Sequence, residues 1–229
     1  MSAVAPDAPT APGALDALDA AAARAWLERF AALVAERAGE LTDLDRPIGD
    51  SDHGVNLHRG TEAVRAALAG PGAGATTPGE VLAAAGRTLV STVGGASGPL
   101  FGTALRRAGK ALGDAPAADA AALAAALRAA LEGVVGLGGA SAGDATMVDA
   151  LEPAVVELER AAARGAGAAA AARAAAGAAG AGAASTVPLV ARKGRASYLG
   201  PRSAGHLDPG ARSVELLVGA LAEVLEGSA

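Results

Sequence analysis

The chain has 229 residues, a formal net charge of −5, no cysteine and only 2% aromatic residues. The length suits one large domain, and the missing cysteines exclude disulfides, thiolate metal sites and cysteine nucleophiles. Because no dense run of Lys or Arg occurs, the composition argues against a nucleic-acid partner. Alanine, the strongest helix former, supplies much of the apolar fraction, which favours an all-α protein of closely packed helices.

Two segments of unusual composition, the N-terminal tail and an alanine-rich stretch, bear on domain organisation and location. Residues 1–13 are rich in Pro and Ala, and we expect a disordered tail there, followed by a single domain over residues 14–229. The tail lacks the basic and apolar regions of a signal peptide. The stretch 165–184 contains Arg173 and several glycines, which makes it a poor membrane span. We therefore expect a cytoplasmic protein without membrane association.

Apolar residues recur at helical spacing through most of residues 14–229. Thr77 and Glu80 stand at the capping-box distance at one helix start, and Asp144 is expected to cap another helix. Apolar–polar alternation over strand length is missing, so we expect about eight helices and no strand. In chain order the predicted helices are 15–41, 55–69, 78–93, 99–112, 117–135, 146–163, 167–182 and 213–225.

Three aspartates crowd into the first interhelical loop, LDRPIGDSDHGVNLHRG (44–60). Asp45, Asp50 and Asp52 offer oxygen ligands, which suit a hard divalent cation such as Mg²⁺. An EF-hand does not fit, because the glycine and the final glutamate fall one place away from the required positions. From these residues alone, metal binding and solvated aspartates that cap a helix both remain open.

Two glycine-rich loops stand before helix starts. STVGGASGPL (91–100) and GLGGASAGDATM (136–147) expose backbone N–H groups at helix N-termini, where phosphate binds well. Neither is a Walker A loop, since GxxxxGK[ST] does not occur. An ordinary turn capped by Ser97 and core packing of Met147 remain open as alternatives.

A basic segment, ARKGRASYLGPRSAGHLDPGA (191–211), follows the alanine-rich part of the chain. Its cations suit phosphate, although a solvated basic loop is the alternative. Carboxylates for Mg²⁺, glycine loops at helix starts and a basic loop are together the components of phosphoryl transfer. If the helices run up and down, the loops at one end meet in a single site. The residues therefore predict a Mg²⁺-nucleotide protein, a phosphotransferase.

Four motifs in order resemble the nucleotide-binding L subunit of dihydroxyacetone kinase, the DhaL family. The resemblance covers most of the chain after residue 40. Ala145 stands where that family commonly has lysine, Pro201 replaces an acidic residue and Phe101 replaces a tyrosine. The motifs are LDRPIGDSDHGVNLHRG (44–60), STVGGASGPLFGTAL (91–105), GDATMVDALEPA (143–154) and ARKGRASYLGPRSAGHLDPGA (191–211).

The resemblance implies an antiparallel barrel of eight helices with the nucleotide site in the loops at one end. It implies that Asp45, Asp50 and Asp52 hold two Mg²⁺ ions that bridge to the phosphates of ADP or ATP. Catalysis is assigned to these aspartates and to Arg195, which offsets phosphate charge. His53, beside the metal loop, is expected to contact phosphate. The implied nucleotide-contacting residues are His53, Gly54, Val55, Asn56, Ala96, Ser97, Gly138, Met147, Arg195, Asp208, Pro209 and Gly210.

The resemblance also implies partners. In the family a separate K subunit holds dihydroxyacetone, and the L subunit supplies the phosphoryl group. In one branch bound ADP is rephosphorylated by a phosphohistidine M subunit of the phosphotransferase system, and in another ATP exchanges freely. The alternatives are an ATP-dependent kinase subunit for a related short sugar, a kinase for another acceptor such as a fatty acid, and a non-catalytic nucleotide-sensing partner. A homodimer is left open.

Overall fold

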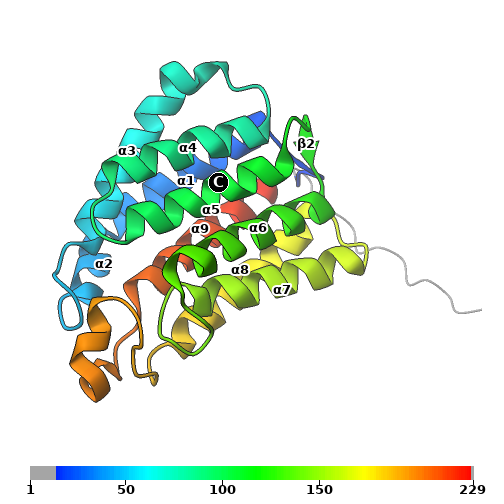
Figure 1. The fold of residues 1–229 in the computed structure, drawn as a ribbon. Coiled ribbons are helices and arrows are strands. Elements are labelled where there is room, and N and C mark those ends of the chain that lie inside the picture. Colours follow the sequence, from blue (N-terminus) through cyan, green and yellow to red (C-terminus); the bar gives the residue numbers. More distant parts are fainter. Residues whose placement is uncertain (1–13, 228–229) are drawn as a thin grey trace, which may run out of the picture.

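The computed structural model describes residues 14–227, and the tail predicted for residues 1–13 lies outside that range. Within it, nine α-helices and two 3₁₀ helices (η1 and η2) account for nearly all regular structure, so the all-α prediction is confirmed (Figure 1). In chain order the elements are β1 (Leu18–Asp19), α1 (Ala20–Glu36), α2 (Ala38–Asp45), α3 (His53–Ala69), η1 (Pro71–Gly74), α4 (Pro78–Thr92), α5 (Ser97–Leu112), β2 (Ala117–Ala118), α6 (Ala120–Gly138), α7 (Val148–Ala163), α8 (Ala168–Ser185), η2 (Arg195–Ser203) and α9 (Pro209–Leu225).

Eight of the α-helices close into a ring. From α3 to α9 each helix packs against the next one in the chain, and α1 closes the ring by packing against both α9 and α3. Successive helices in the ring run antiparallel (Figure 1). The short α2 packs between α3 and α9 and is an addition to the ring at one end. This is the expected eight-helix barrel.

The few aromatic residues tie α1 to its neighbours. Trp26 is buried, and its indole N–H donates to the backbone carbonyl of Leu217 in α9 at 2.7 Å. A buried indole needs such a partner, because an unpaired N–H in an apolar core is costly. The ring of Phe30 lies 6.4 Å, centroid to centroid, from that of Phe101 in α5. These contacts fix α1 against both α9 and α5.

Elsewhere the helices approach closely because glycine and alanine leave room. At the α4–α5 contact, a Cβ on Gly86 would lie 2.6 Å from the carbonyl oxygen of Gly102. At the α7–α8 contact, a Cβ on Gly182 would lie 2.3 Å from the carbonyl oxygen of Asp149. No side chain fits at such distances, so these helix pairs are in backbone contact, as the small residues predict.

The helix predicted over 15–41 is wrong in its start and its continuity. The chain first forms β1, and α1 begins after Asp19, whose side chain accepts the N–H of Ala22 at 2.8 Å. The helix then breaks at Arg37, where φ is −112°, and restarts as α2. The break turns α2 onto α3, where a Cβ on Gly54 would lie 2.0 Å from the carbonyl oxygen of Ala38. Contacts with a distant segment, rather than local propensity, therefore decide where this helix stops.

Three further details of the predicted elements differ in the structure. β1 and β2 form an antiparallel ladder, although no strand was expected, because strands of two residues are too short to show alternation. The segment 185–209, expected to be mostly irregular, contains η2. The last helix begins at Pro209 instead of 213, because Asp208 caps it by accepting the N–H of Ala211 at 2.7 Å.

The capping box at the start of α4 is confirmed. The Thr77 hydroxyl accepts the N–H of Glu80, and the Glu80 carboxylate accepts the N–H of Thr77. Two N–H groups of the first turn are thereby satisfied reciprocally. Backbone N–H bonds, that of Thr76 first, lower the pKa of the Glu80 carboxyl.

Among the described residues, α6 alone is long and apolar enough to cross a membrane by length and composition. Half of that stretch is buried inside the barrel, where α6 packs between α5 and α7. A core helix passes the same test, because a helix that is covered on several sides is apolar on several faces.

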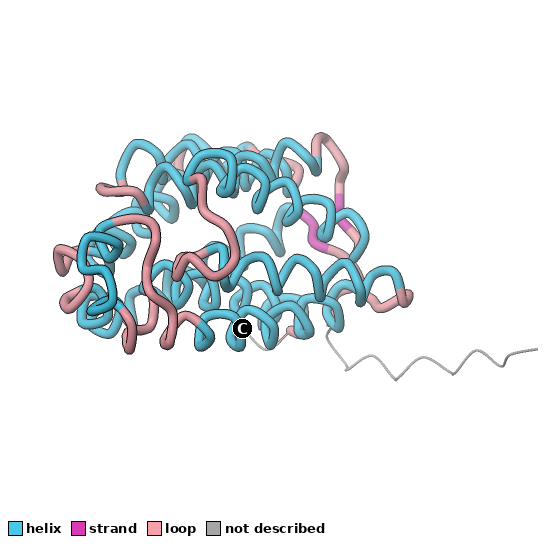
Figure 2. Tube along the Cα trace, turned by 60° about the horizontal axis from the view of Figure 1, so that its bottom comes forward, coloured by secondary structure: helices cyan, strands magenta, loops and turns pink. Residues whose placement is uncertain are grey.

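The interhelical loops divide between the two ends of the barrel. The β1–β2 ladder lies at one end, and η2 with the long loops around it lies at the other (Figures 1 and 2). The loops at the η2 end connect α2 to α3, α4 to α5, α6 to α7 and α8 to α9. Each of the four motifs that the sequence singled out overlaps one of these loops.

Gly86→Ala is expected to destabilise the protein by about 1–3 kcal/mol, because the new methyl group forces α4 away from α5. Gly177→Ala on α8 is the matched control, since a Cβ there meets nothing within 4 Å. The free energy of unfolding of the control is expected to rise by up to about 1 kcal/mol, because alanine has a higher helix propensity than glycine. Urea unfolding followed by circular dichroism measures both. Equal stability of the two variants would contradict the close α4–α5 contact.

Candidate functional site

A cavity of about 660 Å³ opens at the η2 end of the barrel, and all four loops line it. The barrel therefore brings together motifs that lie up to 165 residues apart, from residue 45 to residue 210. The predicted site residues that line it are Asp45, Asp50, Asp52, His53, Asn56, Ala96, Ser97, Gly138, Met147, Arg195, Asp208, Pro209 and Gly210.

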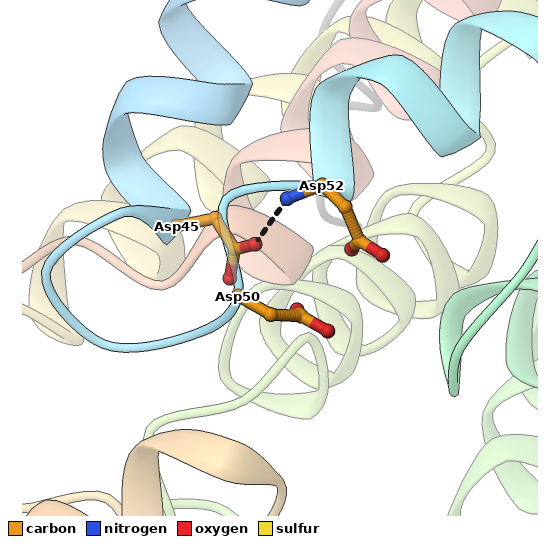
Figure 3. A group of neighbouring side chains, drawn as sticks. All are labelled: Asp45, Asp50 and Asp52. Carbon is orange, nitrogen blue, oxygen red and sulfur yellow. Dashed lines mark hydrogen bonds between the residues drawn. The ribbon is translucent and has the colours of Figure 1, made fainter.

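The three aspartates converge at the edge of this cavity. Asp45 comes from the end of α2, Asp50 from the connecting loop, and Asp52 from the residue before α3 (Figure 3). Each offers a carboxylate oxygen, and these three atoms lie within 4.8 Å of one another. Asp45 is buried, whereas the other two are partly accessible. A hard divalent cation fits this set of donors, because all of them are carboxylate oxygens.

The backbone between the aspartates explains how they meet. One oxygen of Asp45 accepts the N–H of Asp52 at 3.0 Å and that of His53 at 3.3 Å, which turns the loop back on itself. Gly49 allows this turn, since a Cβ there would lie 1.9 Å from the other oxygen of Asp45. Ser51 has a φ of +63°, a left-handed conformation that costs about 1–2 kcal/mol for a residue with a Cβ. Strain is thus concentrated between the two accessible aspartates.

Cations from the basic segment also line the cavity. Arg195 forms an ion pair with Asp50 at 2.9 Å, and its side chain is 68% exposed. An ion pair this exposed contributes little to stability, so Arg195 can exchange Asp50 for an incoming anion at low cost. The N–H of Arg192 donates to the carbonyl of Asp144 at 3.0 Å, which ties the basic segment to the loop before α7.

His53 connects three helices. Its Nε2 lies 2.8 Å from the hydroxyl of Ser213 in α9, and its Nδ1 lies 3.2 Å from the hydroxyl of Ser97 in α5. The Ser213 hydroxyl donates to the carbonyl of Pro209, so it accepts from Nε2–H, which leaves Nδ1 to accept from Ser97. Burial lowers the pKa of the His53 imidazole, against the opposing effect of Asp45 and Asp52, which fits this neutral tautomer. A phosphate contact by the ring would require Ser97 to leave Nδ1.

Asp208 caps α9 at the wall of the cavity. Burial raises the pKa of its carboxyl to about 7, and the nearby charges of Asp149 and Asp45 act in the same direction. Hydrogen bonds from the N–H groups of Ala211 and Gly210 oppose this rise. A carboxyl that is partly protonated at neutral pH repels an anionic ligand less than a fully ionised one would.

Gly54 and Val55 are the two predicted nucleotide contacts that do not line the cavity. Gly54 is needed where α2 and α3 touch, because a Cβ there would collide with Ala38. The Val55 side chain points to solvent and is 58% exposed. What both residues can offer a ligand is their backbone N–H groups in the first turn of α3.

The glycine loops differ from prediction in their caps. Ala96 takes the N-cap position of α5, and Ser97 bonds to His53 as described. Asp144 does not cap the next helix; its carboxylate accepts the N–H of Ser141, and α7 begins only after Met147. Gly138 is the last residue of α6 rather than part of the loop. Gly139, in a left-handed conformation, ends the helix, and the loop begins after it. Met147 is 5% exposed and packs in the core as well as lining the cavity.

The sequence reasoning missed the apolar wall of the cavity. Four of the five residues belong to helices that the periodicity predicted and the fifth, Ile48, lies in the α2–α3 loop, but their exposure to the cavity depends on how these segments meet. Part of this wall could have been predicted from the sequence, because Leu100 and Val134 stand one helical turn from the predicted site residues Ser97 and Gly138 and so share a helix face with them. The missed apolar residues are Ile48, Leu100, Phe101, Val134 and Val148.

Taken together, the cavity offers carboxylate oxygens, basic groups and an apolar wall. Its volume falls in the range of small-molecule and cofactor sites. A ligand that combines a flat apolar ring with phosphates chelated to a divalent cation satisfies all three surfaces.

Comparison with known proteins identifies the class. The sequence profile of the DAK2 domain matches residues 47–223, so the chain belongs to the DAK2 domain family. It is 42% identical over 197 residues to a protein of Escherichia coli (strain K12) named PEP-dependent dihydroxyacetone kinase, ADP-binding subunit DhaL. That match covers 86% of this chain and 93% of the relative. The resemblance to the DhaL family is confirmed.

Longer relatives contain the same domain as one part. D-erythrulose kinase of Mycolicibacterium smegmatis is 37% identical over 86% of this chain, which spans 34% of the kinase. The crystal structure of the dihydroxyacetone kinase from C. freundii in complex with AMP-PNP and Mg²⁺ matches 97% of this chain with a TM-score of 0.68 and 26% identity. This chain spans 37% of that protein. Names of close relatives support a kinase or phosphotransferase role.

Asp208→Asn is expected to stabilise the ligand-free protein, and more so as pH rises from 4 to 8. The folded-state pKa near 7 lies above the ordinary value of 3.8. The contribution of the Asp208 carboxyl to the free energy of unfolding is therefore fully present below pH 4. It is lost as pH rises through 7, by at most about 1.4 kcal/mol per pH unit. Asparagine caps equally well and does not titrate. Melting temperatures in EDTA across this pH range measure the difference.

Asp119→Asn is the matched control, because Asp119 caps α6 through the same kind of bond but is exposed. A gain for Asp208→Asn that is no larger at pH 8 than at pH 5, after subtraction of the control, would contradict the raised pKa.

Gly49→Ala is expected to weaken binding of Mg²⁺ in the presence of ADP by at least about tenfold, because its methyl group displaces the Asp45 carboxylate. Gly39→Ala on α2 is the control, since a Cβ there meets nothing within 4 Å. Isothermal titration measures both variants. Unchanged affinity for Gly49→Ala would show that the Asp45 geometry is dispensable.

Proposed function

We propose that this chain is the nucleotide-binding subunit of a dihydroxyacetone kinase, which binds Mg²⁺ with ADP or ATP and transfers a phosphoryl group to dihydroxyacetone held on a separate K subunit. The observation that carries the proposal is the convergence of Asp45, Asp50 and Asp52 with Arg195 in one cavity. The 42% identity to an ADP-binding subunit supports it, as does the AMP-PNP and Mg²⁺ complex of a relative.

The proposed ligand positions follow from the chemistry of each wall. The three aspartates would hold two Mg²⁺ ions, whose charge neutralises the phosphates and the charge that develops during transfer. Arg195 would leave Asp50 and pair with phosphate, since the guanidinium group binds it bidentately. The first turn of α5, with Ala96 and Ser97, offers backbone N–H groups to the phosphates.

The apolar wall would receive the base. Gly138 leaves the wall open, and a Cβ there would already lie 3.3 Å from Leu100. Met147 adds a soft, polarisable side chain to the same cavity. Lys193 lines the cavity and supplies a cation there, although Ala145 stands where the family commonly has lysine. Asp208, Pro209 and Gly210 would contact the nucleotide from the start of α9.

The transfer itself is proposed to be in line. A bond forms between the acceptor hydroxyl oxygen and the terminal phosphorus of ATP, while the bond to the bridging oxygen breaks and ADP remains. The residues of this chain contribute position and charge: the aspartates and Arg195 act on the phosphates, and His53 orients Ser97. The acceptor hydroxyl arrives on the K subunit, which would dock over the loop end.

The phosphoryl donor is proposed to be a phosphohistidine M subunit of the phosphotransferase system, which regenerates ATP from bound ADP in the cytoplasm. The PEP-dependent relative, of which this chain covers 93%, supports this choice. The second candidate is an ATP-dependent kinase for a related short sugar. It is favoured by the 37% identity to D-erythrulose kinase.

Asp50→Asn is expected to reduce Mg²⁺-ADP affinity and to abolish phosphoryl transfer, because the amide removes one metal-binding charge and the partner of Arg195. Helical circular dichroism should stay unchanged, since Asp50 lies in an accessible loop. Asp43→Asn is the control, because Asp43 pairs with Arg46 on the surface, away from the cavity. The assay combines titration with transfer to dihydroxyacetone in the presence of a K subunit. Full transfer by Asp50→Asn would refute the metal assignment.

The state of the purified protein separates the two donors. Tightly bound ADP that resists exchange supports the phosphotransferase-system branch. Rapid exchange with ATP supports the second candidate.

A further inference from the structure

Asp149, in the first turn of α7, holds the neighbouring loop with both of its carboxylate oxygens. One oxygen accepts the N–H of Gly143 at 2.5 Å, and the other accepts the N–H of Thr146 at 2.8 Å. The side chain is buried, with the residue 6% exposed. Asp149 does not line the proposed nucleotide cavity, so its place is behind the wall rather than in it.

The two bonds bracket a strained residue. Ala145 lies between them with a φ of +56°, a left-handed conformation that a residue with a Cβ seldom adopts. Such a conformation costs about 1–2 kcal/mol and persists only when its surroundings impose it. The Asp149 carboxylate is the group that imposes it here, because it fixes the N–H groups on either side.

The loop that Asp149 fixes forms part of the cavity wall. Ala145, Thr146 and Met147 all line the cavity. The carbonyl of Asp144, in the same loop, accepts the N–H of Arg192 from the basic segment at 3.0 Å. Three residues further along that segment, Arg195 pairs with Asp50 of the aspartate loop. Fixing the loop therefore also fixes the start of the basic segment.

Asp149 is itself held on its backbone side. Its N–H donates to the carbonyl of Thr146 at 3.0 Å. Its carbonyl lies against α8, where a Cβ on Gly182 would come within 2.3 Å. The carboxylate is thus attached to the rigid α7–α8 contact, and it transmits that rigidity to the loop.

We propose that Asp149 is a positioning residue for the nucleotide site. It holds the 143–147 loop in the conformation that places Met147 against the base, and the bond from that loop to Arg192 places the basic segment near the phosphates. The inference rests on the proposed function. It assigns the residue no contact with nucleotide or metal.

The test is Asp149→Asn, measured by titration with Mg²⁺-ADP at a temperature where circular dichroism shows every variant folded. Asparagine has one acceptor oxygen, and its NH₂ group would face an N–H donor, so one of the two loop bonds is lost. We expect about tenfold weaker binding of Mg²⁺-ADP, as when a charge-assisted hydrogen bond is lost. Glu152→Gln makes the same chemical change three residues along α7, outside the cavity lining, and should bind within about twofold of the wild type.

A second variant separates positioning from general stability. Glycine adopts positive φ without strain. The double variant Asp149→Asn with Ala145→Gly should therefore bind Mg²⁺-ADP at least about threefold more tightly than Asp149→Asn alone. Wild-type affinity for Asp149→Asn, or the absence of recovery in the double variant, would overturn the inference. Absence of Mg²⁺-ADP binding by the wild type would instead overturn the proposed function.

Discussion

The candidate site depends on one contact, in which the Asp45 carboxylate accepts the N–H groups of Asp52 and His53. This contact closes the turn between α2 and α3 and brings three carboxylates together, against their mutual repulsion. The turn closes only because Gly49 leaves room beside Asp45 and because Ser51 adopts a left-handed conformation. The energy for that strain comes from the packing of the two helices, which hold both ends of the loop.

The barrel supplies the remaining walls. Its eight helices close in a ring, so every second loop lies at the same end, and four loops distant in sequence share one cavity. Glycines such as Gly86 and Gly102 bring the helix backbones into contact and make the ring narrow enough for the loops to meet. His53 then joins α3 to Ser97 of α5 and Ser213 of α9 by hydrogen bonds.

The charges of the cavity fit a metal–phosphate chelate better than a free metal ion or a free phosphate. A free cation would be attracted by the aspartates but repelled by Arg195, which already forms an ion pair with Asp50. A free anion would be attracted by the basic segment but repelled by the three carboxylates. A metal–phosphate chelate satisfies both sides at once, because its cation faces the aspartates while its phosphates release Arg195. This is why the proposed ligands are Mg²⁺ and nucleotide together.

The sequence by itself determined the helical class, most helix spans, the capping box and most of the polar residues that line the candidate cavity, because periodicity, caps and motif chemistry are local. Only the tertiary structure decided the break at Arg37, the two-residue β1–β2 ladder and the apolar cavity wall around Leu100. It also decided that the Asp149 carboxylate accepts the N–H groups of Gly143 and Thr146, whereas Asp144 accepts that of Ser141 instead of capping α7. Each of these depends on which segments touch across the barrel. Contacts between residues far apart in the chain leave no local pattern to read, so they are settled only when the ring of helices closes.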